Sequence, residues 1–317
     1  MSPAVLILAV VAAGSIPAAS ALASARWPAR SPAAAIVLWQ ALGLGWGLAA
    51  VGALAALGAG PGQEGGGGGH AGVIRAVLAL ASRAVRGTAF RPQGAGLLPE
   101  LRLVSVAAGL LLLALLCWVL VAASAAVLRA RRRQRDLLSL LAHGDPKVPG
   151  ALVVDHPAAA AYCVPGLRSR IVISAGTLEL LDQAELAAVL AHERAHLRER
   201  HDLVLLPFTA LLRAFRWCAV ARRAESAVAL LVEMLADDHA LRHRPARELA
   251  TALLRVGAAG SPVPSGALAA DGDGQVAVRV ARLLRPAPGL SAPALALVCG
   301  TADLLVAVPA VFLFASF

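Results

Sequence analysis

The chain has 317 residues, of which 59% are hydrophobic and 15% charged, and its mean hydropathy is +0.73. This composition argues against an ordinary soluble protein and is typical of a membrane protein. The formal net charge is +10, but only 4% of the residues are aromatic, which leaves few side chains for stacking on nucleic-acid bases. We therefore expect the lipid bilayer with its anionic headgroups, and no nucleic acid, as the partner of the basic charge.

Four apolar stretches are long enough to cross a hydrocarbon core of about 30 Å as helices. They run from about residue 3 to 25, 32 to 59, 103 to 128 and 290 to 317. A cleaved signal peptide is the alternative interpretation of the first stretch, although no basic residue precedes it. Asp303 is the one charged residue of the last stretch, and we assign it no function.

The loop between the second and third stretches, about 61–100, is predicted to hold a flexible glycine-rich linker and then a basic amphipathic stretch at 73–90. A solvated helix without a lipid role is the alternative for that stretch. Five arginines follow the third span between residues 129 and 135, so the positive-inside rule predicts that the next part of the chain is cytoplasmic. The basic stretch at 73–90 argues against this orientation, because it would then be external.

These features predict three parts: residues 1–128 with three transmembrane helices, residues 129–288 as a cytoplasmic working domain, and residues 289–317 as a C-terminal transmembrane helix. The bias toward Ala, Gly and Arg is typical of bacterial genes of high GC content. We therefore expect a multi-pass protein of the bacterial inner membrane.

The working domain begins with strand-like sequence and continues with helical patterns. Short apolar or β-branched runs at 151–154 and 171–174, bounded by Pro and Gly, predict strands. Asp182 and Glu185 form a capping box that starts a helix of about 18 residues. The apolar run 203–220 contains Pro and two Arg, which favours a buried or membrane-grazing helix; a fifth span is the alternative.

The chemistry-bearing motif is His-Glu-Arg-Ala-His at residues 192–196. Residues four apart lie on one face of a helix, so the imidazoles of His192 and His196 can bind one zinc ion. Glu193 is placed to act as the base that takes a proton from the attacking water. The alternative is a pair of surface histidines on a polar helix face.

A zinc protease needs a third protein ligand. The metzincin pattern would place a glycine and a histidine where this chain has Glu199 and Asp202, so that solution is excluded. Glu233 on a second helix is the best candidate, and Asp237, one turn on, is placed to orient a ligand histidine. The alternative for Glu233 is an ordinary solvated acid.

Three further histidines remain open. His201 is a possible spare ligand, and His239 with His243 is either solvated or supplies a group that stabilises the oxyanion.

The motif and its surroundings, from about residue 152 to 240, resemble the M56 family of membrane metallopeptidases, the group of the BlaR and MecR proteins, and more distantly the M48 proteases. The resemblance implies an α+β, zincin-like (gluzincin-type) domain with one Zn²⁺ per chain, ligated by His192, His196 and Glu233 and supported by Asp237. It also implies that the segment Ala161, Tyr162 and Cys163 is an edge strand that pairs with the substrate backbone. The chain ends soon after its last span and has no Ser-x-x-Lys motif, so we expect no penicillin-binding sensor.

The sequence therefore predicts an integral-membrane zinc metalloendopeptidase that cleaves protein or peptide substrates. The resemblance suggests a regulatory protease acting on a cytoplasmic repressor. A catalytically silent membrane signalling or scaffold protein that retains the fold is the alternative. A channel or transporter is a third hypothesis. It is disfavoured because Asp303 is the only charged residue in the four predicted spans of this chain.

Overall fold

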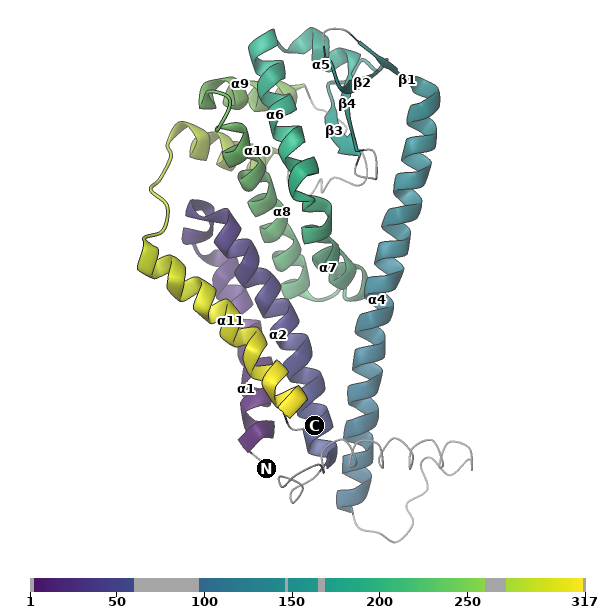
Figure 1. Ribbon diagram of the computed structural model, residues 1–317, viewed down its shortest axis with the longest axis vertical. Coiled ribbons are helices and arrows are strands. Elements are labelled where there is room, and N and C mark those ends of the chain that lie inside the picture. The colour runs from purple at the N-terminus through teal and green to yellow at the C-terminus, as the bar shows by residue number, and fades with distance from the viewer. Residues whose placement is uncertain (1–2, 60–96, 146–147, 165–168, 260–271, 316–317) are drawn as a thin grey trace. The chain divides into compact units, whose positions relative to one another are not determined.

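The computed structural model describes residues 3–59, 97–145, 148–164, 169–259 and 272–315. The described chain is mostly helical and contains a small sheet (Figure 1). It divides into two compact units, the first formed by Met1–Ala25, Val37–Val119 and Ser291–Phe317, the second by Arg26–Ile36 and Leu120–Leu290. The predicted linker and the basic amphipathic stretch at 73–90 lie outside the described residues.

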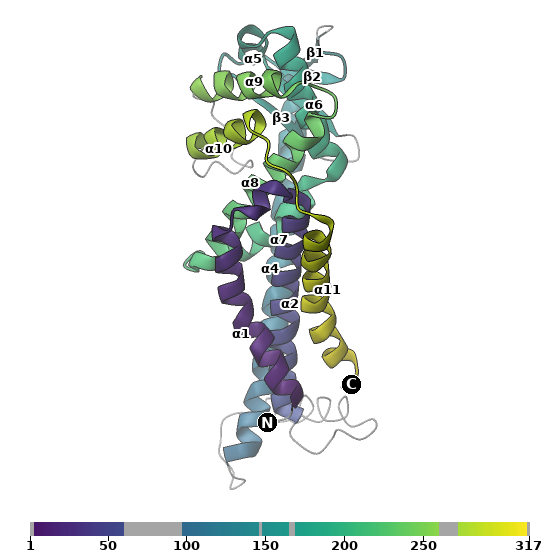
Figure 2. The same ribbon diagram turned by 90° about the vertical axis from the view of Figure 1, so that its left-hand side faces the viewer.

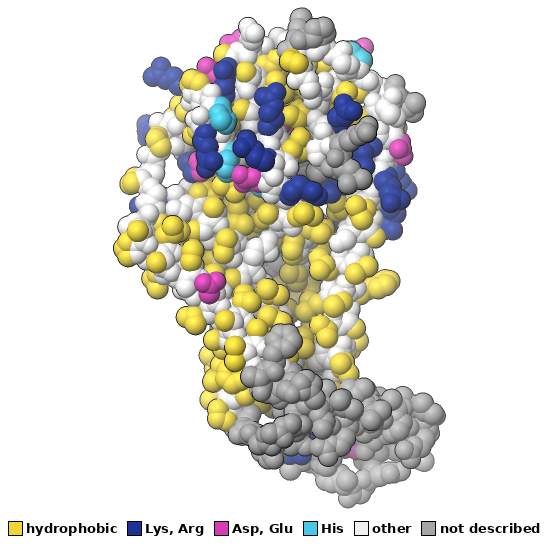
Figure 3. Space-filling view, viewed as in Figure 1, with side chains coloured by type: hydrophobic (Ala, Val, Ile, Leu, Met, Phe, Trp, Pro, Cys, Tyr) yellow, Lys and Arg dark blue, Asp and Glu magenta, His cyan; other side chains and the backbone are white. Residues whose placement is uncertain are grey.

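Apolar helices build the first unit. They are α1 (Pro3–Ser24), most of α2 (Pro32–Ala59), the first half of α4 (Leu97–Leu141) and α11 (Ala292–Ala315). In the described part of the chain these four helices are long and apolar enough to cross a membrane, which agrees with the predicted number of spans. The face of this unit seen in Figure 3 is almost wholly hydrophobic, as lipid contact requires. A Cβ at Gly45 would overlap the carbonyl of Leu305, so only glycine allows α2 and α11 this approach.

The third predicted span, 103–128, is only part of a longer helix. α4 has 45 residues and continues through the arginine cluster to Leu141. Arginine and leucine are both strong helix formers, so the change from apolar to basic residues does not end the helix.

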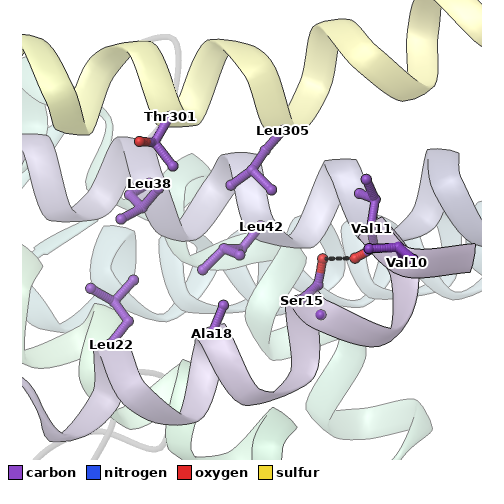
Figure 4. A pocket seen from close by; sticks show the side chains of 10 residues that line it. Val10, Val11, Ser15, Ala18, Leu22, Leu38, Leu42, Thr301 and Leu305 are labelled. Carbon is purple, nitrogen blue, oxygen red and sulfur yellow. Dashed lines mark hydrogen bonds between the residues drawn. The ribbon is translucent and has the colours of Figure 1, made fainter. Parts of the chain in front are cut away.

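An apolar cavity of about 250 Å³ lies among α1, α2 and α11 (Figure 4). Its two hydroxyl-bearing side chains are already bonded within their own helices. Ser15 Oγ donates to the carbonyl of Val11 and Thr301 Oγ1 to that of Leu297, both at 2.7 Å. This cavity therefore offers no free polar group for chemistry, and the reactive groups of the protein lie elsewhere.

The second unit contains a four-stranded sheet in the order β1-β2-β4-β3. Its strands are β1 (Ala142–Gly144), β2 (Ala151–Val154), β3 (Ala161–Val164) and β4 (Arg170–Ser174). The strands predicted at 151–154 and 171–174 are confirmed, and they pair in parallel, whereas β3 runs antiparallel to β4 at the edge of the sheet. The sequence Ala161, Tyr162 and Cys163 is thus an edge strand, as expected.

Helices complete the second unit, and α5 (Ala175–Leu180) and α6 (Gln183–Glu199) contact the sheet. They are followed in chain order by α7 (His201–Ala214), α8 (Ala219–Ala240), α9 (Ala246–Ala258) and α10 (Gly272–Leu284). Leu186, Val189 and Leu190 of α6 share a buried cluster with Ile171 and Ile173 of β4. α6 also packs against α8 and α9, and α9 against α10 (Figure 2).

The predicted capping box at the start of α6 is present. The Asp182 side chain accepts from the backbone N–H groups of Ala184 and Glu185, and the Glu185 side chain accepts from the backbone N–H of Asp182. Glu185 also pairs with Arg255 of α9 at 3.1 Å. The cap fixes where α6 begins and therefore which residues face the sheet.

The apolar run 203–220 is not one helix. α7 has 14 residues and stops at Ala214, and α8 starts only at Ala219. At about 1.5 Å per residue, α7 extends about 21 Å, too short to cross the hydrocarbon core. The fifth-span alternative is therefore excluded.

A short 3-10 helix, η1 (Trp27–Arg30), belongs to the second unit and contacts the end of α10 and the loop after it. Arg282 Nε donates to the Ala29 carbonyl at 2.7 Å, and Arg30 Nε donates to the Pro288 carbonyl at 2.9 Å. These bonds hold η1 against the end of α10 and the loop that follows it.

Candidate metal centre

The two histidines of the motif lie one turn apart on α6, and Glu233 of α8 faces them. His192 Nε2 is 3.0 Å from His196 Nε2. Glu233 places Oε2 at 3.3 Å from His192 Nε2 and Oε1 at 3.4 Å from His196 Nε2. Each of the three residues offers an atom within 4.8 Å of the others, the one such group in the part of the chain that the structure describes.

These separations fit the coordination shell of a small cation. Two atoms about 2.0–2.2 Å from one zinc ion at tetrahedral angles stand about 3.3–3.6 Å apart. The three observed separations between the two Nε2 atoms and the carboxylate, 3.0, 3.3 and 3.4 Å, lie close to this range. Two imidazoles and a carboxylate are also a donor set that zinc prefers.

Behind the first histidine, Asp237 and an arginine complete a buried ionic cluster. His192 Nδ1 lies 3.0 Å from Asp237 Oδ1, and its Nε2 faces Glu233 and the candidate site. Arg279 of α10 donates to both oxygens of Asp237, at 2.9 and 2.7 Å, and its Nη1 is 2.8 Å from Glu233 Oε2. One guanidinium thus holds Asp237 and Glu233 of α8 together.

The second histidine is oriented by another histidine. Arg200 takes the left-handed conformation (φ 52°), which turns the chain between α6 and α7 and brings His201 back onto α6. His201 Nδ1 lies 2.9 Å from His196 Nδ1. If His196 Nε2 coordinates a metal, its Nδ1–H donates to His201, whose own N–H on Nε2 then faces Glu199 at 3.4 Å.

His201 therefore faces the back of His196 and not the candidate site, and its position favours an orienting role over that of a spare ligand. His239 is bonded at both nitrogens, to the Leu235 carbonyl at 2.8 Å and to Glu199 at 2.7 Å. His243 is exposed. Neither joins the group around Glu233.

Glu193, the second residue of the motif, lies on α6, which packs against the edge strand β3, and a hydrogen bond from the thiol of Cys163 in that strand acts to lower its pKa. Burial, together with the charges of Glu193 and Asp202, raises the pKa of Cys163 to about 12, so the thiol keeps its proton and remains a donor. Burial raises the pKa of Glu193 to about 7. A carboxyl group with such a pKa can both accept and release a proton at neutral pH. The catalytic candidate is thus next to the proposed substrate strand.

Burial and the acidic neighbours act in opposite directions on the histidines. For His192, burial lowers the pKa, but the hydrogen bonds to Asp237 and Glu233 outweigh it and raise the pKa to about 10. For His196, burial dominates and lowers the pKa to about 3. Burial raises the pKa of Glu233, yet Arg279 and the two histidines hold it well below its usual range. Glu233 is thus an anion, the form in which a carboxylate binds metal.

Arg279 contacts two acids of the candidate site, and the sequence analysis did not predict it. It lies 42 positions beyond Asp237, in a helix that the sequence analysis did not delimit. The one sequence feature that pointed to such a residue was the pair of acids Asp237 and Asp238, because a buried acid needs a cation beside it. With 29 basic residues in the chain, no local pattern singles out Arg279 and Arg282 as the partners of these acids.

The family model of peptidase family M48 matches residues 105–243, less than half of the chain. No curated protein and no solved structure matches. The matched part includes His192, Glu193, His196, Glu233 and Asp237 but not Arg279. The resemblance to M56 stays a prediction, whereas the more distant likeness to M48 is consistent with this match. Together with four apolar helices, the match supports assignment of the chain to the membrane-type metallopeptidases.

Proposed function

We propose that this protein is an integral-membrane zinc metalloendopeptidase with a gluzincin-type site. One zinc ion is held by His192, His196 and Glu233, and Glu193 is the catalytic base. The observation that carries the proposal is the convergence of two imidazole nitrogens and one carboxylate, with separations of 3.0–3.4 Å that fit ligands around one zinc ion.

A bound zinc ion supplies Lewis acidity and a water molecule of lowered pKa. Glu193 accepts the proton of the attacking water and passes it to the leaving amine. Asp237 and His201 keep the two ligand histidines in the tautomer whose Nε2 faces the site. Arg279 holds Asp237 and Glu233 so that both carboxylates are in place before the substrate arrives.

The substrate is a protein segment in extended form that adds to the outer edge of β3. Such pairing uses the main-chain groups that an edge strand leaves free. Cys163 of β3 contacts Glu193, so a peptide paired with the outer edge of β3 would pass close to the catalytic base. A membrane-linked, cytoplasmic regulatory protease acting on a repressor is the physiological role we propose, following the family resemblance.

Zinc content tests the ligand set. Asp237→Asn, which changes a residue that only orients a ligand, is expected to lower zinc affinity roughly 10–100-fold. Glu233→Ala, which removes a ligand, is expected to lower it by more. The measurement is a zinc titration of the purified protein in detergent. Asp238→Asn is the matched control, since Asp238 pairs with Arg282 and not with a histidine. Unchanged affinity in Glu233→Ala would place the third ligand elsewhere.

His201 gives a separate test. His201→Phe removes the acceptor for the His196 N–H while filling a similar volume, so zinc affinity is expected to fall roughly 10-fold or more. His201→Asp is expected to restore most of it, because a carboxylate accepts the same hydrogen bond. The visible spectrum of the cobalt-substituted protein reports whether the coordination geometry is preserved. Equal affinities in all three proteins would show that His201 does not orient His196.

A further inference from the structure

The turn between α7 and α8, residues 215–218, carries an unusually exposed aromatic side chain. Trp217 is 79% exposed and makes an edge-to-face contact with Phe215, with ring centroids 6.2 Å apart. Hydrogen bonds to two backbone carbonyls, one from a backbone N–H and one from an arginine side chain, hold the turn in place. Cys218 N–H donates to the Phe215 carbonyl at 2.8 Å, and Arg222 donates to the Arg216 carbonyl at 2.6 Å. Trp217 is thus held outward by a fixed turn.

The exposure of Trp217 matches that of side chains on the apolar helices. Among the described residues, the other large hydrophobic side chains above 70% exposure are Leu111, Trp118 and Leu297. All three lie on helices long and apolar enough to span a membrane. Trp217 lies outside these helices, and water is an unfavourable environment for so large an apolar surface.

The surroundings of the turn are strongly basic. Residues 203–224 contain four arginines and no acidic residue. The four are Arg213, Arg216, Arg222 and Arg223, and each is exposed. Tryptophan and arginine together, next to an apolar helix, are the combination found where a protein surface meets lipid headgroups.

We propose that the α7–α8 turn is a membrane-interface anchor that binds anionic lipid headgroups. The indole of Trp217 lies at the headgroup level, and the exposed arginines pair with the lipid phosphates. Charge complementarity favours this partner over a second copy of the chain, whose matching turn carries the same positive charge. The anchor depends on the turn alone, whether or not the candidate site binds zinc.

The anchor would also limit how far the candidate site lies from the lipid. Trp217 and Glu233 are 16 residues apart, and α8 covers most of that interval, so the axial separation is about 24 Å at 1.5 Å per residue. The substrates reached within such a distance are protein segments close to the membrane.

Tryptophan fluorescence of the full chain in lipid nanodiscs tests the proposal. The emission of Trp217 is obtained as the difference between wild type and Trp217→Phe, in phosphatidylglycerol-rich discs with and without brominated acyl chains. We expect this difference emission to be blue-shifted and quenched at least about twofold by bromine. Trp118→Phe provides the quenched reference, and Arg247→Trp, at an exposed position on α9, provides the reference in water.

A second variant tests the role of charge. Arg216→Gln combined with Arg223→Gln is expected to reduce the quenching of Trp217, and phosphatidylcholine discs are expected to do the same. A red-shifted, unquenched Trp217 signal would overturn the anchor. A blue-shifted but unquenched signal would also overturn it, because protein and not lipid would then cover the indole.

Discussion

Replacing Glu193 by Gln is expected to abolish measurable peptide cleavage while zinc content stays at the wild-type level. Glutamine keeps the size of the side chain and can still accept the Cys163 hydrogen bond, but it takes no proton from water. Loss of a general base costs about 10²–10⁴ in rate. The measurement is cleavage of fluorescently labelled casein by the purified protein in detergent, with zinc determined on the same samples.

The matched control for this variant is Glu179→Gln, the same change at an exposed position of α5. It should leave cleavage and zinc content unchanged. Full activity in Glu193→Gln would exclude this residue as the base. Zinc binding without cleavage in the wild type would contradict the endopeptidase and favour a non-catalytic scaffold that retains the fold.

Local patterns account for the features that the sequence analysis predicted correctly. The spacing of His192 and His196 places both rings on one face of a helix, and the capping box at Asp182 fixes where that helix starts. The strands at 151–154 and 171–174 follow from short apolar runs with clear boundaries. Each of these inferences needed only a few consecutive residues.

The features that were missed depend on the path of the chain. His201 contacts His196 only because Arg200 adopts a left-handed conformation, which arginine rarely takes, so no sequence rule predicts this turn. Arg279 reaches Asp237 from a helix that arrives 42 residues later. The zincin-like classification itself, together with the domain bounds and the orientation in the membrane, stays a prediction.

The ionic cluster behind the candidate site carries the second large expected effect. Arg279→Met is expected to destabilise the fold by about 3–5 kcal/mol, because it leaves Asp237, 1% exposed, as a buried charge without its cation. Arg279→Lys should recover little of this loss, since one ammonium group cannot donate to both oxygens of Asp237 and to Glu233 together. The free energy of unfolding is measured by chemical denaturation in detergent.

A double-mutant cycle separates this charge effect from simple loss of packing. Combining Arg279→Met with Asp237→Asn removes both the cation and the anion that needs it. The double variant should therefore lose clearly less unfolding free energy than the sum of the two single variants. Arg282→Met is the control on the same helix, and its smaller expected cost follows from the greater exposure of its partner Asp238, 34%. Strictly additive losses would mean that Arg279 stabilises α10 through packing alone. A loss of stability smaller than the sum would instead show that Asp237 needs Arg279. Because the same guanidinium also holds Glu233, a correctly formed metal centre would then depend on the docking of α10.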